Sequence, residues 1–94
     1  MENIKKNNKI LTLIEKIHFT DIQKYLLKTN WKKIDTKREH IVLFYLENST
    51  NERVAEILLP LSKDFADYTK AIYEAILTIS KVENREVEEI INDL

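Results

Sequence analysis

The chain has 94 residues and a formal net charge of −1, contains neither cysteine nor glycine, and is 44% hydrophobic. This length suits one domain with one core, and the apolar content predicts a folded chain. The lack of cysteine excludes disulfides and thiolate metal ligands, and the lack of glycine excludes the glycine-rich loops that cradle phosphates. No segment approaches the roughly 18 consecutive apolar residues of a membrane helix, so we expect a cytoplasmic protein without a membrane contact.

The absence of glycine also affects the backbone. Other residues must occupy the left-handed conformations that turns and helix ends require, and asparagine and aspartate tolerate them best. We therefore expect Asn30, Asn48, Asn51 and Asn84 at turns or helix caps.

Two helices are predicted before the first strand. The first spans residues 8–17, after a frayed start at residues 1–7, because its apolar residues recur at near-helical spacing. Thr20 and Gln23 fit a capping box, which predicts a second helix that runs to about Thr29.

Three strands are predicted next, at residues 31–35, 40–46 and 53–59, and Pro60 ends the third. Their connections are too short for parallel crossovers, which predicts an antiparallel meander. The middle strand is apolar on both faces, so we expect helices or a partner to cover both sides of it.

Two further helices complete the pattern. Ser62 or Asp64 is predicted to cap a long helix that ends near Val82, and Asn84 to cap a final helix. The buried stripe of the long helix is predicted to be Phe65, Tyr68, Ile72, Ile76 and Ile79. The order α-α-β-β-β-α-α predicts one α+β domain over residues 1–94, with a three-stranded antiparallel meander packed by helices.

Charge is divided along the chain. Residues 1–39 hold ten Lys or Arg against five Asp or Glu, whereas residues 40–94 hold five against eleven. The residues predicted to bind a protein partner or RNA are Lys24, Lys28, Trp31, Lys32, Lys33, Lys37 and Arg38. An aromatic ring among cations is a pairing that single-stranded nucleic acids use. The alternative is that Trp31 belongs to the core and the lysines protect an exposed edge strand.

Candidates for catalysis are few. His40 opens the middle strand beside Lys37 and Arg38, where cations would favour the neutral imidazole that a general base needs. The alternative is an ordinary histidine at a solvated strand end. Glu83, Glu86, Glu88, Glu89 and Asp93 scatter over several helix faces, which favours a solvated surface over a cation site. We therefore predict no metal and no small-molecule cofactor.

The segment from residue 21 to 79 reads α-β-β-β-α and resembles the double-stranded-RNA-binding-domain-like fold, in particular HicA-type mRNA interferases. The segments that correspond are Lys28-Thr29-Asn30-Trp31, Arg38-Glu39-His40-Ile41 and Ile57-Leu58-Leu59-Pro60. The resemblance implies a ribonuclease with His40 as its base. The family's Gly-Ser pair is replaced here by Arg38 and Glu39, and only one of its two histidines is present.

The C-terminal part is also similar to a group of small uncharacterised bacterial proteins, and this similarity implies no activity. The matching segments are Leu59-Pro60-Leu61, Asp67-Tyr68 and Glu83-Asn84-Arg85.

Together these features favour a small non-catalytic module that docks a protein partner or RNA through its basic edge and outer helices. Bacterial toxin–antitoxin and phage-defence systems are the contexts we expect for it. The alternatives are a HicA-like ribonuclease that uses His40 and a structural homodimerisation domain.

Overall fold

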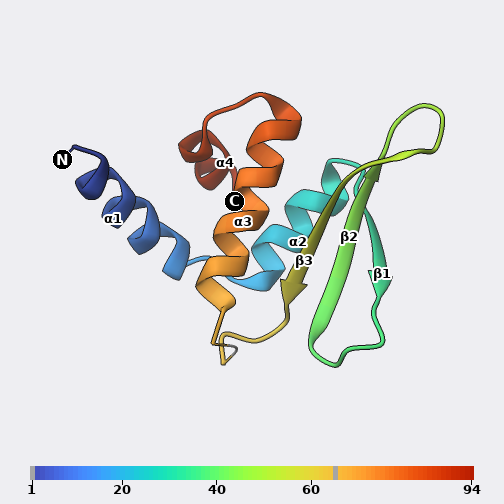
Figure 1. Ribbon diagram of the computed structural model, residues 1–94, viewed down its shortest axis with the longest axis horizontal. Coiled ribbons are helices and arrows are strands. Elements are labelled where there is room, and N and C mark those ends of the chain that lie inside the picture. Colours follow the sequence, from blue (N-terminus) through green and yellow to red (C-terminus); the bar gives the residue numbers. More distant parts are fainter. Residues whose placement is uncertain (1, 65) are drawn as a thin grey trace.

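The structure is a computed structural model that describes residues 2–64 and 66–94, with side chains from Lys9 onward. Its elements are α1 (Glu2–Glu15), α2 (Phe19–Lys28), β1 (Lys32–Asp35), β2 (Ile41–Glu47), β3 (Arg53–Pro60), α3 (Tyr68–Glu83) and α4 (Val87–Asp93). The predicted α+β order α-α-β-β-β-α-α is confirmed (Figure 1).

The three strands form one antiparallel sheet in the order β1-β2-β3. In the central pair Val42 lies opposite Leu59 and Phe44 opposite Ile57, and all four side chains are buried. Paired residues share a face of the sheet, so these four define the face that packs on the helices. A register irregularity at Leu46 and Glu47 ends the regular pairing near the β2–β3 turn.

The core lies between this face and the helices. From α2 it receives Ile22 and Leu26, both fully buried. From α3 it receives Tyr68, Ile72, Ala75, Ile76 and Ile79. Tyr68, Ile72, Ile76 and Ile79 are thus confirmed as part of the predicted stripe, whereas Phe65 falls outside the described residues. Burying each large apolar side chain contributes about 1.5–3 kcal/mol, which makes this layer the main source of stability.

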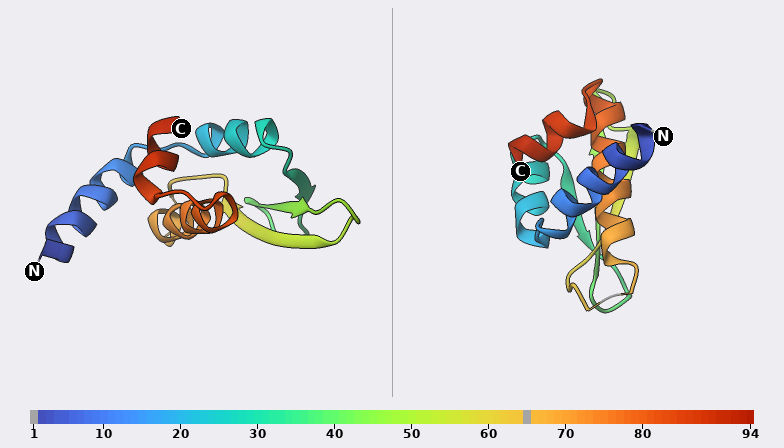
Figure 2. Two further views of the ribbon diagram at one scale, coloured as in Figure 1. Left: turned by 90° about the horizontal axis from the view of Figure 1, so that it is seen from above. Right: turned by 90° about the vertical axis from the view of Figure 1, so that its left-hand side faces the viewer.

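The helices gather on one side of the sheet. α3 packs along β3, and α1 and α4 pack on α3 (Figures 1 and 2). α1 is anchored by the buried side chains of Ile10 and Ile14, and Ile17 is buried just after it. The N-terminal half of α1 extends away from the body (Figure 2). The other face of the sheet stays partly exposed, because Leu58 there retains 55% of its surface. Within residues 2–64 and 66–94 the helices cover only one face of the central strand, and cover of the other face by a partner stays a prediction.

The starts of the predicted helices needed correction. α2 begins at Phe19, not after Thr20, because the backbone N–H of His18 donates to Asp21 Oδ2 at 3.0 Å and so caps the helix earlier. α3 begins at Tyr68 after Asp67, so neither Ser62 nor Asp64 is its cap. Instead the hydroxyl of Ser62 accepts a hydrogen bond from the backbone N–H of Asp64 in the preceding turn.

Asparagine does replace glycine at left-handed positions. Asn30, Asn51 and Asn84 have φ angles of 74°, 63° and 53°. Asn84 ends α3 instead of starting α4, which corrects the predicted cap. Asn48 acts through its side chain, whose Oδ1 accepts the backbone N–H groups of Thr50 and Glu52 in the β2–β3 turn.

His40 is also left-handed, at φ 67°, which the sequence pattern does not predict. Its carbonyl accepts the backbone N–H of Leu61 at 2.8 Å, which continues the β2–β3 pairing past Pro60. Over residues 2–64 and 66–94, no helix is both long and apolar enough to cross a membrane.

Candidate binding surfaces

The predicted basic residues occupy three separate places. The first is the core, which takes Trp31. Its side chain is only 3% exposed, and its backbone N–H donates to the carbonyl of Leu26 at 2.9 Å. This burial supports the structural alternative for Trp31 and removes it from the binding set, because a buried indole presents no face to a nucleobase.

The second place is the sheet edge and the turn after it. Every residue of β1 is exposed, as suits an edge strand protected by lysines. Lys32 pairs with Glu47, and this hydrogen bond raises the pKa of the Lys32 ammonium. Lys33, Lys37 and Arg38 are exposed and, within the described chain, their side chains form no ion pair.

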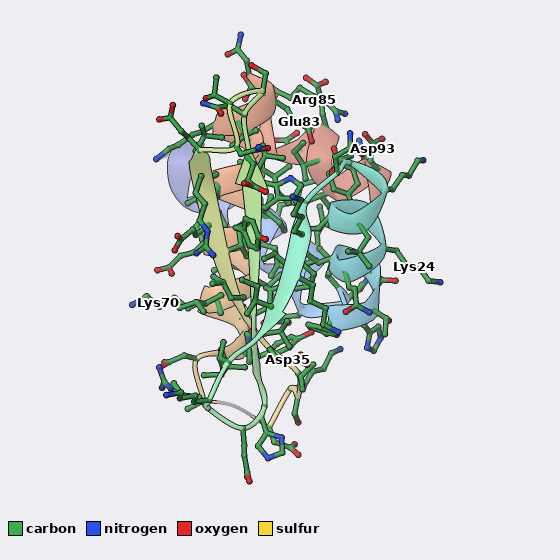
Figure 3. The ribbon with its side chains drawn as sticks, turned by 90° about the vertical axis from the view of Figure 1, so that its right-hand side faces the viewer. Lys24, Asp35, Lys70, Glu83, Arg85 and Asp93 are labelled. Atoms are coloured by element: carbon green, nitrogen blue, oxygen red, sulfur yellow. The ribbon has the colours of Figure 1, made fainter. Side chains whose placement is uncertain are left out.

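The third place is a cavity of about 720 Å³ between α2 and the α3–α4 corner, which we call the α2–α4 cavity. Lys24 and Lys28, one turn apart on α2, line it together with Asp21, Tyr25, Thr29, Glu83, Arg85, Asp93 and Leu94. Its volume falls within the range of small-ligand sites. Figure 3 shows Lys24 projecting outward from α2, while Glu83, Arg85 and Asp93 gather at one end of the molecule.

A hydrogen-bonded cluster lines the inner side of this cavity. The hydroxyl of Tyr25 donates to Glu83 Oε2 at 2.7 Å. Arg85 Nη1 donates to Glu83 Oε1 at 3.0 Å, and Arg85 Nη2 donates to Asp93 Oδ2 at 2.6 Å. The cluster joins α2 to the α3–α4 corner, which are distant in sequence.

This arrangement shifts two protonation equilibria. Burial, followed by the hydrogen bond to Glu83, raises the pKa of Tyr25 to about 12. The hydrogen bond to Asp93, followed by that to Glu83, raises the pKa of Arg85 above its ordinary value. Tyr25 is thus a neutral donor and Arg85 a fixed cation across the physiological range.

The internal pairing determines which charges of the α2–α4 cavity remain available. Glu83 and Asp93 are both engaged by Arg85. Asp21 accepts the capping hydrogen bond from His18. Lys24 and Lys28 form no ion pair in the part of the chain that the structure describes, so they carry the unmatched charge at the cavity.

The cluster was missed by sequence reasoning. The acidic residues near the C-terminus look like a solvated surface, yet Glu83, Glu89 and Asp93 converge on one arginine. The only local signal was Arg85 to Glu89, four residues apart, a spacing at which helical side chains meet. No group of three or more His, Asp or Glu side chains among the described residues is placed to hold a metal ion.

His40, the candidate base, lies in the β1–β2 turn and not within the α2–α4 cavity. Its side chain is 63% exposed, and Nε2 lies 3.8 Å from a carboxylate oxygen of Glu39.

The remaining surface feature is apolar. Ile34, Leu43 and Leu58 lie opposite one another across all three strands, on the face away from the core. Ile34 and Leu58 are exposed and Leu43 is half-buried. We call this side of the sheet the open face.

Comparison with protein-family models, curated proteins and solved structures finds no match. The likeness to HicA-type interferases therefore rests on the quoted segments and on the strand and helix order.

Proposed function

We propose that this chain is a non-catalytic, cytoplasmic binding module that docks an acidic segment of a protein partner at the α2–α4 cavity. The observation that carries the proposal is the pair Lys24 and Lys28. Among the described residues they form no ion pair, and they line a cavity whose acidic side chains are already engaged. A carboxylate from a partner would meet two ammonium groups, and charge-assisted hydrogen bonds of this kind are the stronger ones.

A protein segment suits this surface better than RNA. Phosphate-led binding needs cations repeated along a continuous track. Here Lys32 is paired with Glu47, Trp31 is buried, and Asp21 and Asp35 interrupt the remaining cations. A short acidic segment needs only the local pair on α2.

The test compares two labelled probes by fluorescence anisotropy: a Glu- and Asp-rich peptide and a mixed pool of RNA oligonucleotides, each at low and high salt. The variant Lys24→Glu/Lys28→Glu removes the proposed contact. The control Lys70→Glu/Lys81→Glu makes the same charge change on exposed positions of α3 that do not line the cavity. We expect the peptide to bind the native chain and the control, and to bind the cavity variant at least tenfold more weakly.

Other outcomes would redirect the assignment. RNA binding that weakens steeply with salt would favour a nucleic-acid module, because phosphate contacts release counterions. RNA cleavage that disappears in His40→Ala would favour the ribonuclease. Binding of neither probe, or equal loss in both lysine variants, would overturn the proposal.

A further inference from the structure

The open face continues into a groove between β3 and α3, which we call the β3–α3 seam. A cavity of about 270 Å³ on one side of Leu58 is lined by Glu56, Ile57, Leu58, Ala71, Glu74, Ala75 and Thr78. A second, of about 160 Å³, lies on its other side and is lined by Arg38, Ile41, Leu58, Pro60, Asp67 and Ala71. Leu58 and Ala71 belong to both, so the seam is one continuous depression with an exposed leucine at its middle.

The apolar surface therefore extends beyond the sheet onto α3. It runs from Ile34 on β1 through Leu43 and Leu58 to Ala71 on α3. Monomeric proteins seldom leave contiguous apolar area of this kind without a use for it.

The charges around the seam differ between its two ends. Arg38 and Asp67 lie at the end near Pro60, whereas Glu56 and Glu74 lie at the other. Glu56 is paired with Arg53 at 3.4 Å, whereas Glu74 forms no ion pair with any residue whose side chain the structure describes. Arg38 has no ion pair in residues 2–64 and 66–94, so it is available to an acid from outside.

We propose that the open face and the β3–α3 seam are the interface for a second copy of this chain, packed as a two-fold dimer. We place the two-fold axis parallel to the row of Ile34, Leu43 and Leu58. Rotation about it stacks this row on the same row of the second copy, and the strands of the two copies then run in opposite directions. The same rotation turns the Arg38 end of one copy toward the Glu74 end of the other, and the reverse. Such self-complementarity is what a two-fold interface requires, since each contact occurs twice.

The seam follows α3 for about three turns. From Asp67 to Thr78 the helix rises about 16 Å. Ala71 and Ala75 on its floor allow a side chain from the other copy to approach the backbone of α3 closely. This surface is distinct from the α2–α4 cavity, so a dimer leaves Lys24 and Lys28 accessible.

The experiment is size-exclusion chromatography with light scattering over a range of micromolar concentrations. We expect a mass of twice 11.2 kDa for the native chain. Leu58→Lys places a charge at the centre of the interface and should weaken association at least about thirtyfold, as at other interface hot spots. Leu27→Lys is the matched control, because Leu27 is 48% exposed but lies on α2, and it should remain dimeric.

A charge exchange tests the geometry without relying on Leu58. Arg38→Glu and Glu74→Arg should each weaken the dimer, and the double variant should restore it, because the contact is recreated with opposite sign. Glu15→Arg makes the same charge change as Glu74→Arg at an exposed position of α1 that lines neither cavity of the seam, and it should have no effect. Circular dichroism checks that each variant is folded.

Three results would overturn the inference: a native chain that stays monomeric at every concentration, a Leu58→Lys variant that still dimerises, or single charge variants that leave the dimer unchanged. A monomer that binds the acidic peptide would refute only the dimer and leave the proposed function intact. A dimer that does not bind the peptide would refute the proposed function and leave the dimer intact.

Discussion

The hydroxyl of Tyr25 on α2 donates to the carboxylate of Glu83 at the end of α3, at 2.7 Å and across 58 residues of sequence. Arg85 donates to the same two groups, to the Tyr25 oxygen at 3.2 Å and to Glu83 at 3.0 Å. The three side chains form a closed ring of hydrogen bonds at the inner side of the α2–α4 cavity. Because the ring joins α2 to the end of α3, it fixes the shape of the proposed binding site.

Tyr25→Phe should therefore destabilise the fold. A hydrogen bond to a charged group contributes about 1.5–3 kcal/mol when buried, and this one is half-exposed, so we expect a loss of about 1 kcal/mol. Chemical denaturation measures it. Tyr73→Phe is the control, since the Tyr73 hydroxyl has no hydrogen-bond partner among the described residues and its loss should be close to neutral. If Tyr25→Phe and Glu83→Gln were strictly additive in the double variant, the two side chains would not be coupled.

Stability should fall at high pH because of the same phenol. An unfolded tyrosine titrates near 10, whereas the pKa of Tyr25 in the fold is about 12. The folded state holds the proton more tightly, so its contribution is full below about pH 10 and is lost as pH rises through about 12. Burial raises the pKa of Tyr68 as well, and the hydrogen bond to Glu47 raises that of Lys32, so both act in the same direction.

Tyr25→Phe separates the contributions to this alkaline loss. Unfolding free energies measured on both sides of pH 10 should decline less steeply in the variant, which lacks the phenol. When tyrosinate formation is followed by absorbance, the variant should lack one tyrosine that ionises at high pH in the native chain. An identical decline in both proteins would mean that Tyr25 ionises as freely in the fold as in the unfolded chain.

His40 should be replaceable by glycine with a gain in stability. Its φ of 67° is left-handed, which costs a residue with a Cβ about 1 kcal/mol, and glycine adopts it freely. The side chain is 63% exposed, so little packing is lost. We expect His40→Gly to raise the unfolding free energy by roughly 0.5 kcal/mol, after allowing for glycine's greater freedom when unfolded.

A matched control is His18→Gly, because His18 has an ordinary φ of −99° at the start of α2. There glycine offers no relief of strain and should destabilise the chain. If His40→Gly lowered the unfolding free energy more than His18→Gly, the idea that the left-handed φ of His40 costs stability would be disproved.

Local rules accounted for most of the fold. Proline, asparagine and alternating apolar residues marked the strand ends and turns, because these effects act within a few residues. The predicted start of α2 was wrong because the Asp21 carboxylate accepts the backbone N–H of His18 and so caps the helix earlier. A preference for serine or threonine at the N-cap does not predict this contact. The prediction for Asn84 was wrong for a different reason. An asparagine can end one helix or begin another, and the left-handed φ of Asn84 shows that it ends α3.

The candidate site was less accessible to such rules. Lys24 and Lys28 were identified because they are one helical turn apart, and they do line one cavity. The positions of Glu83, Arg85 and Asp93 opposite them depend on how α3 and α4 pack, which is long-range information. What covers the open face could not be predicted for a related reason: an apolar strand indicates that something covers it, but not whether that cover is a helix of the same chain.

Trp31, the single tryptophan, gives a direct probe of the core. At 3% exposure its fluorescence should be shifted to the blue and resist quenching by acrylamide until the chain unfolds. Adding RNA should leave its emission unchanged, because no base can stack on a buried indole. Trp31→Ala should cost about 3–5 kcal/mol through the cavity it leaves, so loss of binding in that variant would reflect unfolding and not a missing contact. Efficient quenching in the folded protein, or an emission change on adding RNA, would return Trp31 to the surface and restore the case for a nucleic-acid module.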